Sequence, residues 1–372
     1  MGKDIIVVAD YHDANIEWRR FSEATGEQEC GNRPNERAAW LRLLEECQAA
    51  AAHQGGRVVL VMESTTGWAR MKTLTRGRAE LVLANVLQMP LPPKAHRRKS
   101  DRIDTGRILR EWRNGELPTS FQPRPAWRRL RRVVGLHVDL TRRQTALRNY
   151  LNRLLAHETW RERGKGLWSQ RGQGELRLWA QSLPAWDRLV VEQKLDQLEE
   201  IAQRLAQVQG HLQRLAERWA PARKLDAIYG VGALSAVGIA ACIGPVRRFG
   251  NADALIAYAG LAPGVRQSNT CRRDGHVGGG GTDKLLRFYL LEATTWARRI
   301  PRYRTSYQRM LKRRGKKVAR RHVARRLLRS IDAVLRYGRE FAPTGAAVPP
   351  RPLPSPAGGS PPEGGAGVGQ AA

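Results

Sequence analysis

Four carboxylates lie at positions where acids that bind metal ions are often found. Asp10 and Glu63 each end an apolar run with the character of a buried strand. Asp101 and Asp104 are three residues apart, so on a helix they share one face of the first turn. Carboxylates held so close repel one another unless a cation lies between them, and Mg²⁺ prefers such oxygen ligands. The set could hold Mg²⁺ for phosphoryl transfer. Spacing alone nevertheless favours a structural role, because acids at strand ends and helix starts are common.

A second chemical feature is a serine within the glycine- and arginine-rich segment 260–275. Ser268 stands among Arg266, Arg272 and Arg273. Guanidinium groups bind phosphate oxygens and stabilise the charge that develops during phosphoryl transfer. The Ser268 hydroxyl is therefore a candidate nucleophile that would form a covalent phosphoserine. The alternative is an ordinary loop serine that makes a hydrogen bond within a turn.

The chain carries a large excess of positive charge. Its 372 residues include 65 Lys and Arg against 34 Asp and Glu, a formal net charge of +31. A nucleic acid is the expected partner, because binding phosphates releases counterions. An anionic membrane surface is the rival partner, but it would require a basic amphipathic helix or a lipidation signal, and Ile6 breaks the myristoylation pattern that begins at Gly2. The sequence also has no apolar run of about eighteen residues, so no membrane span is expected. The cations gather in four segments, residues 94–113, 124–132, 142–163 and 312–329.

The four cysteines are widely scattered, which indicates a reducing compartment. Cys30, Cys47, Cys242 and Cys271 form no C-x-x-C pair, so neither a zinc knuckle nor a disulfide framework is expected. The N-terminal segment also lacks the long apolar region of a signal peptide. We therefore expect a cytoplasmic protein.

The elements that would position the acids belong to a predicted α/β domain in the first third of the chain. Asp10 and Glu63 would both lie at strand ends, where sites assemble in open sheets. Ser100 is the predicted N-cap of a helix that begins at Asp101. The predicted strands are residues 5–10, 14–21, 26–30, 57–63 and 80–87, and a further helix is predicted over 34–53.

From about residue 125 the pattern becomes helical. Gly230-Val231-Gly232 lies between two predicted helices, as in a helix-hairpin-helix whose backbone amides bind a phosphate. Apolar residues spaced alternately by three and four indicate a coiled-coil or helical-hairpin arm; they are Leu198, Ile201, Leu205, Val208, Leu212 and Leu215. Further helices are predicted over 254–260, 283–299 and 302–340, with a loop at 261–282 and a Pro- and Gly-rich disordered tail from 343.

The chain resembles the transposases of the IS110/IS1111 insertion-sequence group, a family in which these features occur together. Three places in the chain resemble the family's RuvC-like DEDD set. They are Asp10, Glu63-Ser64-Thr65-Thr66-Gly67 and Lys99-Ser100-Asp101-Arg102-Ile103-Asp104. The family's second domain is resembled in order and spacing by Gly230-Val231-Gly232, Phe249, residues 257–263, Arg266-Gln267-Ser268, Gly275 and Leu286-Arg287, and further on by residues 324–328. The resemblance covers roughly residues 4–340.

The resemblance implies a fold in four parts. Residues 1–125 would form an RNase H-like (RuvC-like) α/β domain that carries the DEDD acids, and residues 126–220 a helical or coiled-coil arm. Residues 221–342 would form a mainly α-helical C-terminal domain with the serine loop and a helix-hairpin-helix element. Residues 343–372 would be a disordered tail.

The resemblance also implies an RNA-guided DNA transposase. The acids Asp10, Glu63, Asp101 and Asp104 would bind Mg²⁺ or Mn²⁺, and Ser268 would be the nucleophile that becomes linked to DNA. Nucleic acid would be contacted by Gly230, Gly232, Arg266, Arg272 and Arg273. The partners would be double-stranded DNA, a structured non-coding guide RNA and further copies of the chain, in a dimer or tetramer with composite active sites. The enzyme would act in the bacterial cytoplasm, at the nucleoid.

Two other functions remain open at this point. A RuvC-like metal-dependent nuclease would use the acids, and its C-terminal domain would bind DNA without any need for Ser268. An inactive relic would bind nucleic acid without chemistry. The relic is suggested by Asn269 after the serine and by residues 277–281, Val-Gly-Gly-Gly-Gly, where the family tends to have a Ser/Thr-Lys pair. Asp13 is an alternative to Asp10 as the first acid, although it follows the predicted strand.

Overall fold

The computed structural model describes residues 3–64, 67–90, 101–157, 166–262, 264–268, 271–275 and 282–343. For residues 101–102, 264–268 and 271–275 the description covers the backbone alone. The chain divides into two compact units between Gln122 and Pro123. The predicted N-cap Ser100 and the predicted tail beyond Pro343 lie outside the described residues.

The N-terminal unit is built on a mixed five-stranded sheet with the strand order β3-β2-β1-β4-β5. β1 (Ile5–Tyr11), β2 (Asn15–Ser22) and β3 (Gln28–Pro34) are successively antiparallel, whereas β4 (Val58–Glu63) and β5 (Glu80–Ala84) continue the sheet parallel to β1. The five predicted strands are confirmed with small shifts at their ends. A mixed sheet with helices is consistent with the expected RNase H-like α/β domain.

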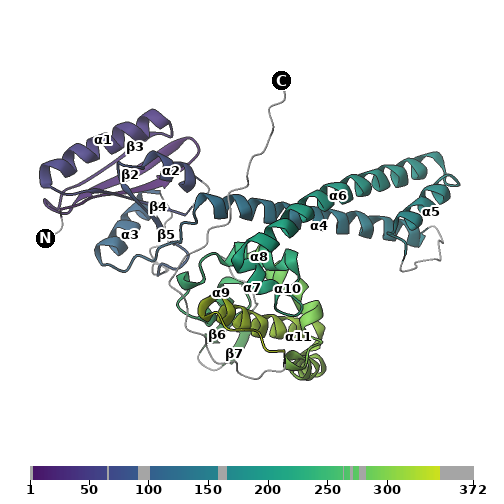
Figure 1. The fold of residues 1–372 in the computed structure, drawn as a ribbon. Coiled ribbons are helices and arrows are strands. Elements are labelled where there is room, and N and C mark those ends of the chain that lie inside the picture. Colours follow the sequence, from purple (N-terminus) through teal and green to yellow (C-terminus); the bar gives the residue numbers. More distant parts are fainter. Residues whose placement is uncertain are drawn as a thin grey trace. The chain divides into compact units, whose positions relative to one another are not determined.

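Helices cover both faces of this sheet, α1 (Arg37–Gln54) on one side and α3 (Asp101–Arg113) on the other (Figure 1). Side chains alternate between the two faces along each strand. Ile5, Val7 and Ala9 therefore pack in the α1 core with Trp40 and Leu43, and α2 (Trp68–Leu74) adds Met71 and Leu74 to that core. Ile6 and Val8 pack in the α3 core with Ile108 and Leu109. Burial on both faces explains the unbroken apolar runs of β1 and β4.

A long helical hairpin begins the C-terminal unit. α4 (Pro125–His157) and α6 (Ala185–Arg218) pack along each other, and α5 (Gln170–Ala180) lies at the far end of the pair (Figure 1). Three residues of the predicted seam, Leu198, Leu205 and Leu212, are buried, whereas Ile201 and Val208 are half-buried. The seam therefore packs largely within the chain, and a helical hairpin is the form that the structure supports.

The core of the C-terminal unit surrounds α8 (Ala233–Ile243). Every residue from Ala236 to Ile243 is buried, and a methyl group on Gly238 would lie 2.5 Å from the Tyr289 ring. This close contact explains why small residues dominate α8. The helices around it are α7 (Ala220–Asp226), α9 (Ala252–Tyr258), α10 (Lys284–Ala297) and α11 (Pro301–Tyr337), with a short 3-10 turn, η2 (Val246–Arg248).

α11 is not one continuous helix as predicted. Gly315 has φ +77° and ψ 172°, which no helix accommodates, and the two halves fold back on each other there. The Tyr303 and Ser330 hydroxyls lie 2.9 Å apart, and Arg326 donates to Ser306 at 2.6 Å, so the halves run antiparallel. No helix in the described part of the chain is both long and apolar enough to cross a membrane.

Candidate active site

Asp10 and Glu63 lie at the same end of two adjacent parallel strands. The register pairs Ala9 of β1 with Met62 of β4, and each acid is the next residue along its strand. The parallel direction of β1 and β4 therefore places two of the predicted carboxylates next to each other in the sheet. The register thus places both acids at the ends of their strands, as the sequence predicted.

Both acids belong to the face of the sheet that α3 covers. Alternation along the strands places Asp10 and Glu63 with the buried valines that pack against Ile108 of α3. Asp104 precedes Ile108 by one helical turn, so it lies on the sheet-facing side of α3. Asp101 is the first residue of the same helix. The fold thus brings Asp10, Glu63 and Asp104 to one side of the sheet.

The chemistry of these residues fits a divalent cation, because carboxylate oxygens are the ligands that Mg²⁺ and Mn²⁺ accept most readily. Asp10, Glu63 and Asp104 are half-buried, so they are accessible and yet partly desolvated. Among the described side chains, no three Asp, Glu, His or Cys residues lie close enough together to hold an ion. The Asp101 side chain lies outside that description. The residues present therefore supply the ligand type and a shared face.

Two further polar residues lie beside Asp10 that the sequence did not single out for this site. His12 Nε2 is 3.3 Å from Asp10 Oδ2. Glu17 stands directly opposite Asp10 in the antiparallel β1–β2 pair, which places both on the same face. The predicted strand over 14–21 contained Glu17, but its register against β1 was not visible. Asp13, the alternative first acid, is exposed in the turn between the two strands.

Ser268 lies on a β-hairpin, so the predicted loop over 261–282 is wrong in its central part. β6 (Gly264–Ser268) and β7 (Cys271–Gly275) pair antiparallel, with Ser268 opposite Cys271 at the turn end. Arg266 stands opposite Arg273, and Arg272 opposite Gln267. Backbone pairing thus places Arg272 and Arg273 beside the strand that carries Arg266 and ends at the serine. The side chains of these residues lie outside the described part of the structure.

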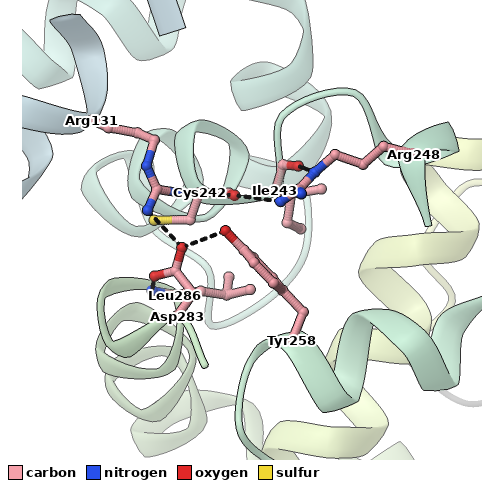
Figure 2. Close-up of polar contacts among 7 residues, drawn as sticks. All are labelled: Arg131, Cys242, Ile243, Arg248, Tyr258, Asp283 and Leu286. Atoms are coloured by element: carbon pink, nitrogen blue, oxygen red, sulfur yellow. Dashed lines mark hydrogen bonds and ion pairs between the residues drawn. The ribbon is translucent and has the colours of Figure 1, made fainter. Parts of the chain in front are cut away.

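A buried carboxylate lies at the base of this hairpin, immediately before α10. Asp283 accepts hydrogen bonds from the Leu286 backbone amide at 2.9 Å, the Tyr258 hydroxyl at 2.8 Å and the Arg131 guanidinium at 2.7 Å (Figure 2). Arg131 also donates to the Cys242 carbonyl at 3.1 Å. Residue spacing gave no sign of this group, because Arg131 and Asp283 are 152 positions apart.

The two glycines of the predicted helix-hairpin-helix have different surroundings. Gly230 has φ +93°, and a methyl group there would lie 2.6 Å from the Ala297 nitrogen. Gly232 caps the N-terminus of α8, and no atom lies within 4 Å of the place a methyl group would take. Gly230 is therefore required by the close approach of α10, whereas the backbone at Gly232 is open to an anion.

The turn of α11 concentrates positive charge. Residues 312–317, Lys-Arg-Arg-Gly-Lys-Lys, place five cations in six residues, and residues 312–317 are exposed. Further along the helix, burial and then Arg325 and Arg326 lower the pKa of His322. Cations crowded in this way attract a polyanion, whose binding relieves their mutual repulsion.

Comparison with known protein families gives two matches. Residues 23–158 match a model of DEDD transposases of the IS110 type, and residues 222–309 match a model described as the IS116/IS110/IS902 transposase family. The first match includes Glu63, Asp101 and Asp104, and begins after Asp10. The second includes the hairpin that carries Ser268. A comparison with curated proteins found no match.

Proposed function

The chain belongs to the IS110 family of DNA transposases, and we propose that it cuts and rejoins DNA through a covalent phosphoserine at Ser268. The observation that carries this proposal is the placement of Asp10 and Glu63 at adjacent strand ends, on the face covered by the helix of Asp104. A basic chain with such a group of acids has the two properties that metal-assisted chemistry on a polyanion requires.

The acids would hold the metal ion and leave it open to DNA. Asp10, Glu63, Asp101 and Asp104 are the residues we assign as ligands of Mg²⁺ or Mn²⁺. When bound, the ion would neutralise charge on the phosphate and activate the attacking or leaving oxygen. His12, whose Nε2 lies 3.3 Å from Asp10 Oδ2, would orient that ligand by donating to the carboxylate.

Ser268 would act in two chemical steps. Its Oγ attacks the phosphorus of a DNA phosphodiester, the Oγ–P bond forms, and the bond from phosphorus to the leaving deoxyribose oxygen breaks. The serine proton passes through solvent to that leaving oxygen, which departs as a hydroxyl. A hydroxyl of another DNA end then attacks the phosphoserine, which restores a phosphodiester and frees Ser268. Arg266, Arg272 and Arg273 would stabilise the charge on the phosphate oxygens in both steps.

Several basic elements would hold the nucleic acids. Backbone amides at the start of α8, beside Gly232, would bind a phosphate in a helix-hairpin-helix with α7, and the exposed cations at residues 312–317 would contact the duplex. We also propose a structured guide RNA, encoded by the element, that selects the DNA by base pairing. The proposed setting is the bacterial cytoplasm, at the nucleoid.

Copies of the chain would assemble through the α4–α6 hairpin as a coiled-coil arm, into a dimer or tetramer. Trp186 at the start of α6 is 80% exposed, and Leu178 and Leu189 nearby in the sequence are also exposed. Apolar side chains exposed in this way at the far end of a helical pair are typical of a surface that becomes buried on association. The acids of one copy would then act with the serine of another.

The test is to capture the covalent intermediate. The full chain is expressed with its flanking DNA, which supplies any encoded RNA, and DNA covalently bound to protein is measured after denaturation. We expect an adduct that requires Ser268, Asp101 and a divalent metal. Thr270→Ala is the matched control, because Thr270 carries a second hydroxyl only two positions after Ser268 in the sequence, and it should retain the adduct.

Three outcomes contradict the proposal in different ways. An adduct that survives Ser268→Ala but not Thr270→Ala would show that Thr270, and not Ser268, is the nucleophile. Metal-dependent nicking that survives Ser268→Ala, with no adduct, identifies a nuclease whose C-terminal unit binds DNA. Binding without any cleavage, in wild type and in both variants, identifies a nucleic-acid-binding relic.

A further inference from the structure

We propose that Asp283 is a positioning residue that, with Tyr258 and Arg131, fixes the base of the Ser268 hairpin. The inference rests on the proposed role of Ser268 as the nucleophile. It concerns residues outside the DEDD acids and the serine. None of the three is assigned to touch DNA; they act by holding the strands that carry the hydroxyl.

Two hydrogen bonds join the entry and the exit of the hairpin. The Asp283 backbone amide donates to the Tyr258 carbonyl at 2.7 Å, and the Tyr258 hydroxyl donates to the Asp283 carboxylate at 2.8 Å. The two residues are 25 positions apart, and β6 and β7 both lie between them. Tyr258 and Asp283 therefore close the loop through backbone and side chain at once.

Gly260 brings the two ends of the hairpin into still closer contact. It has φ +65°, and a methyl group there would lie 2.9 Å from both the Thr282 Cβ and the Arg287 guanidinium. The chain entering the hairpin thus packs directly on the chain leaving it. A side chain at this position would push the two apart, in addition to the strain of a positive φ.

Arg131 ties this closure to the body of the unit. Its guanidinium donates to Asp283 at 2.7 Å and to the Cys242 carbonyl at 3.1 Å, which connects α4 and the end of α8 with the start of α10 (Figure 2). Arg248 of η2 donates to the Ile243 carbonyl at 2.9 Å and lies over the Tyr258 ring at 4.5 Å. The base of the hairpin is therefore held from several elements.

The Asp283 carboxylate is well suited to fix geometry, because its side chain is only 2% exposed and it accepts three hydrogen bonds from different directions. Burial, and then the charge of Asp283, raise the pKa of Tyr258, so the phenol keeps its proton and remains a donor at neutral pH. A buried ion pair adds little net stability, because desolvation offsets its attraction, but it favours one arrangement of its partners. In catalysis, a small displacement of a reacting atom has a large effect on rate.

The experiment compares Tyr258→Phe and Asp283→Asn with wild type in the full chain. Tyr258→Phe removes one hydroxyl, and Asp283→Asn retains an oxygen that can cap α10. We expect the rate of adduct formation at saturating DNA to fall about 10- to 100-fold, with DNA affinity unchanged. Backbone hydrogen exchange should accelerate across residues 259–283 and stay unchanged elsewhere in the unit. The double variant should cost less than the product of the two single effects.

Asp332→Asn is the matched control. Asp332 is also buried, and its salt bridge with Arg336 at 2.8 Å lies within the same unit. The described partners of this pair include the Val246 carbonyl of η2 but none of Arg131, Tyr258 and Asp283. We expect Asp332→Asn to lower the melting temperature as Asp283→Asn does, while the adduct rate and the exchange of residues 259–283 stay at wild-type values.

Two results would overturn the inference. One is an adduct rate that falls equally in Asp332→Asn and Asp283→Asn, which would trace the loss to stability. The other is unchanged exchange at the hairpin in both Tyr258→Phe and Asp283→Asn. If wild type forms no adduct that needs Ser268, the proposed function fails instead, and the exchange data alone still decide whether Asp283 holds the hairpin.

Discussion

In the N-terminal unit two of the proposed metal ligands, Asp10 and Glu63, lie on strands of the central sheet, whereas in the C-terminal unit the proposed nucleophile lies on a hairpin held at its base. Asp10 and Glu63 are placed by the register of β1 and β4, whose neighbouring residues are buried on both faces. Ser268 is placed through the contacts of Tyr258 and Asp283, at the other end of the hairpin. The first arrangement is local to the sheet, and the second depends on residues far along the chain.

This difference has consequences for how each site fails. A one-residue slip of a strand would turn its acids to the opposite face, and burial of both faces makes such a slip costly. The hairpin can instead tilt or open by small amounts when its base weakens. We therefore expect substitutions near the acids to act through chemistry, and substitutions at the hairpin base to act through geometry.

The largest expected effect is the loss of chemistry on neutralising one acid of the sheet. Asp10→Asn or Glu63→Gln should lower metal-dependent DNA cleavage by roughly 100-fold or more, because a charged ligand of the ion is lost. The melting temperature should change by a few degrees at most. Calorimetric titration with Mg²⁺ should show weaker binding in both variants. Asp13→Asn is the control, and a loss at Asp13→Asn without one at Asp10→Asn would show that Asp13 is the ligand instead.

The next effect tests how strongly the C-terminal unit depends on close backbone contact. Gly230→Ala should destabilise it by about 2–4 kcal/mol, because the positive φ is strained and the methyl group overlaps the α10 backbone. Gly232→Ala should cost less than about 1 kcal/mol, since its surroundings are open. Urea unfolding, with hydrogen exchange of α10 amides, measures both. Equal effects at the two glycines would contradict the described packing.

A smaller effect is expected when cations are removed from one unit and the salt dependence of DNA binding is measured. Replacing Lys316 and Lys317 with alanine should reduce the slope of log binding constant against log salt by about 2, one unit per lost phosphate contact. Stability should not change, because both side chains are exposed at the turn of α11. Lys72→Ala, an exposed cation of the N-terminal unit, is the control. An unaltered slope in the double variant would remove this turn from the DNA surface.

The smallest effect concerns pH and the C-terminal unit. Burial lowers the pKa of His137 below its ordinary value of 6.5, so the unfolded chain takes up a proton more readily than the folded chain. The stability that neutral His137 contributes is complete above pH 6.5. It is lost as the pH falls from there through the lowered pKa of the folded state. The melting temperature should fall by a few degrees between pH 7.5 and pH 5.5, and it should fall by less in His137→Gln. His137 contacts the Tyr289 hydroxyl at 2.7 Å, which glutamine can also reach.

A pH response equal in His137→Gln and wild type would assign the effect to another group. His322 is the candidate, because burial and neighbouring arginines lower its pKa as well. The two contributions differ in their response to salt. Repulsion from arginines is screened by salt, whereas the cost of burying charge at His137 is not.

Sequence patterns predicted the strands, most helices and the positions of the acids, because alternation and helical periodicity follow directly from burial. They missed the β6–β7 hairpin, whose strands are polar and carry few β-branched residues, and they missed the reversal of α11 at Gly315. A glycine between cations was the available signal for that reversal. The roles of Ser268 and of all four acids remain predictions.

Residue types and their spacing were enough to predict the strands of the sheet, the helical arm and the family. The folded chain was needed to show that Glu17 faces Asp10 and that Arg131, Tyr258 and Asp283 meet at the base of the serine hairpin. The physical reason is that local periodicity reports burial over a few neighbouring residues. Contacts between distant segments depend on register and on how whole helices pack, and neither leaves a repeating signal along the chain.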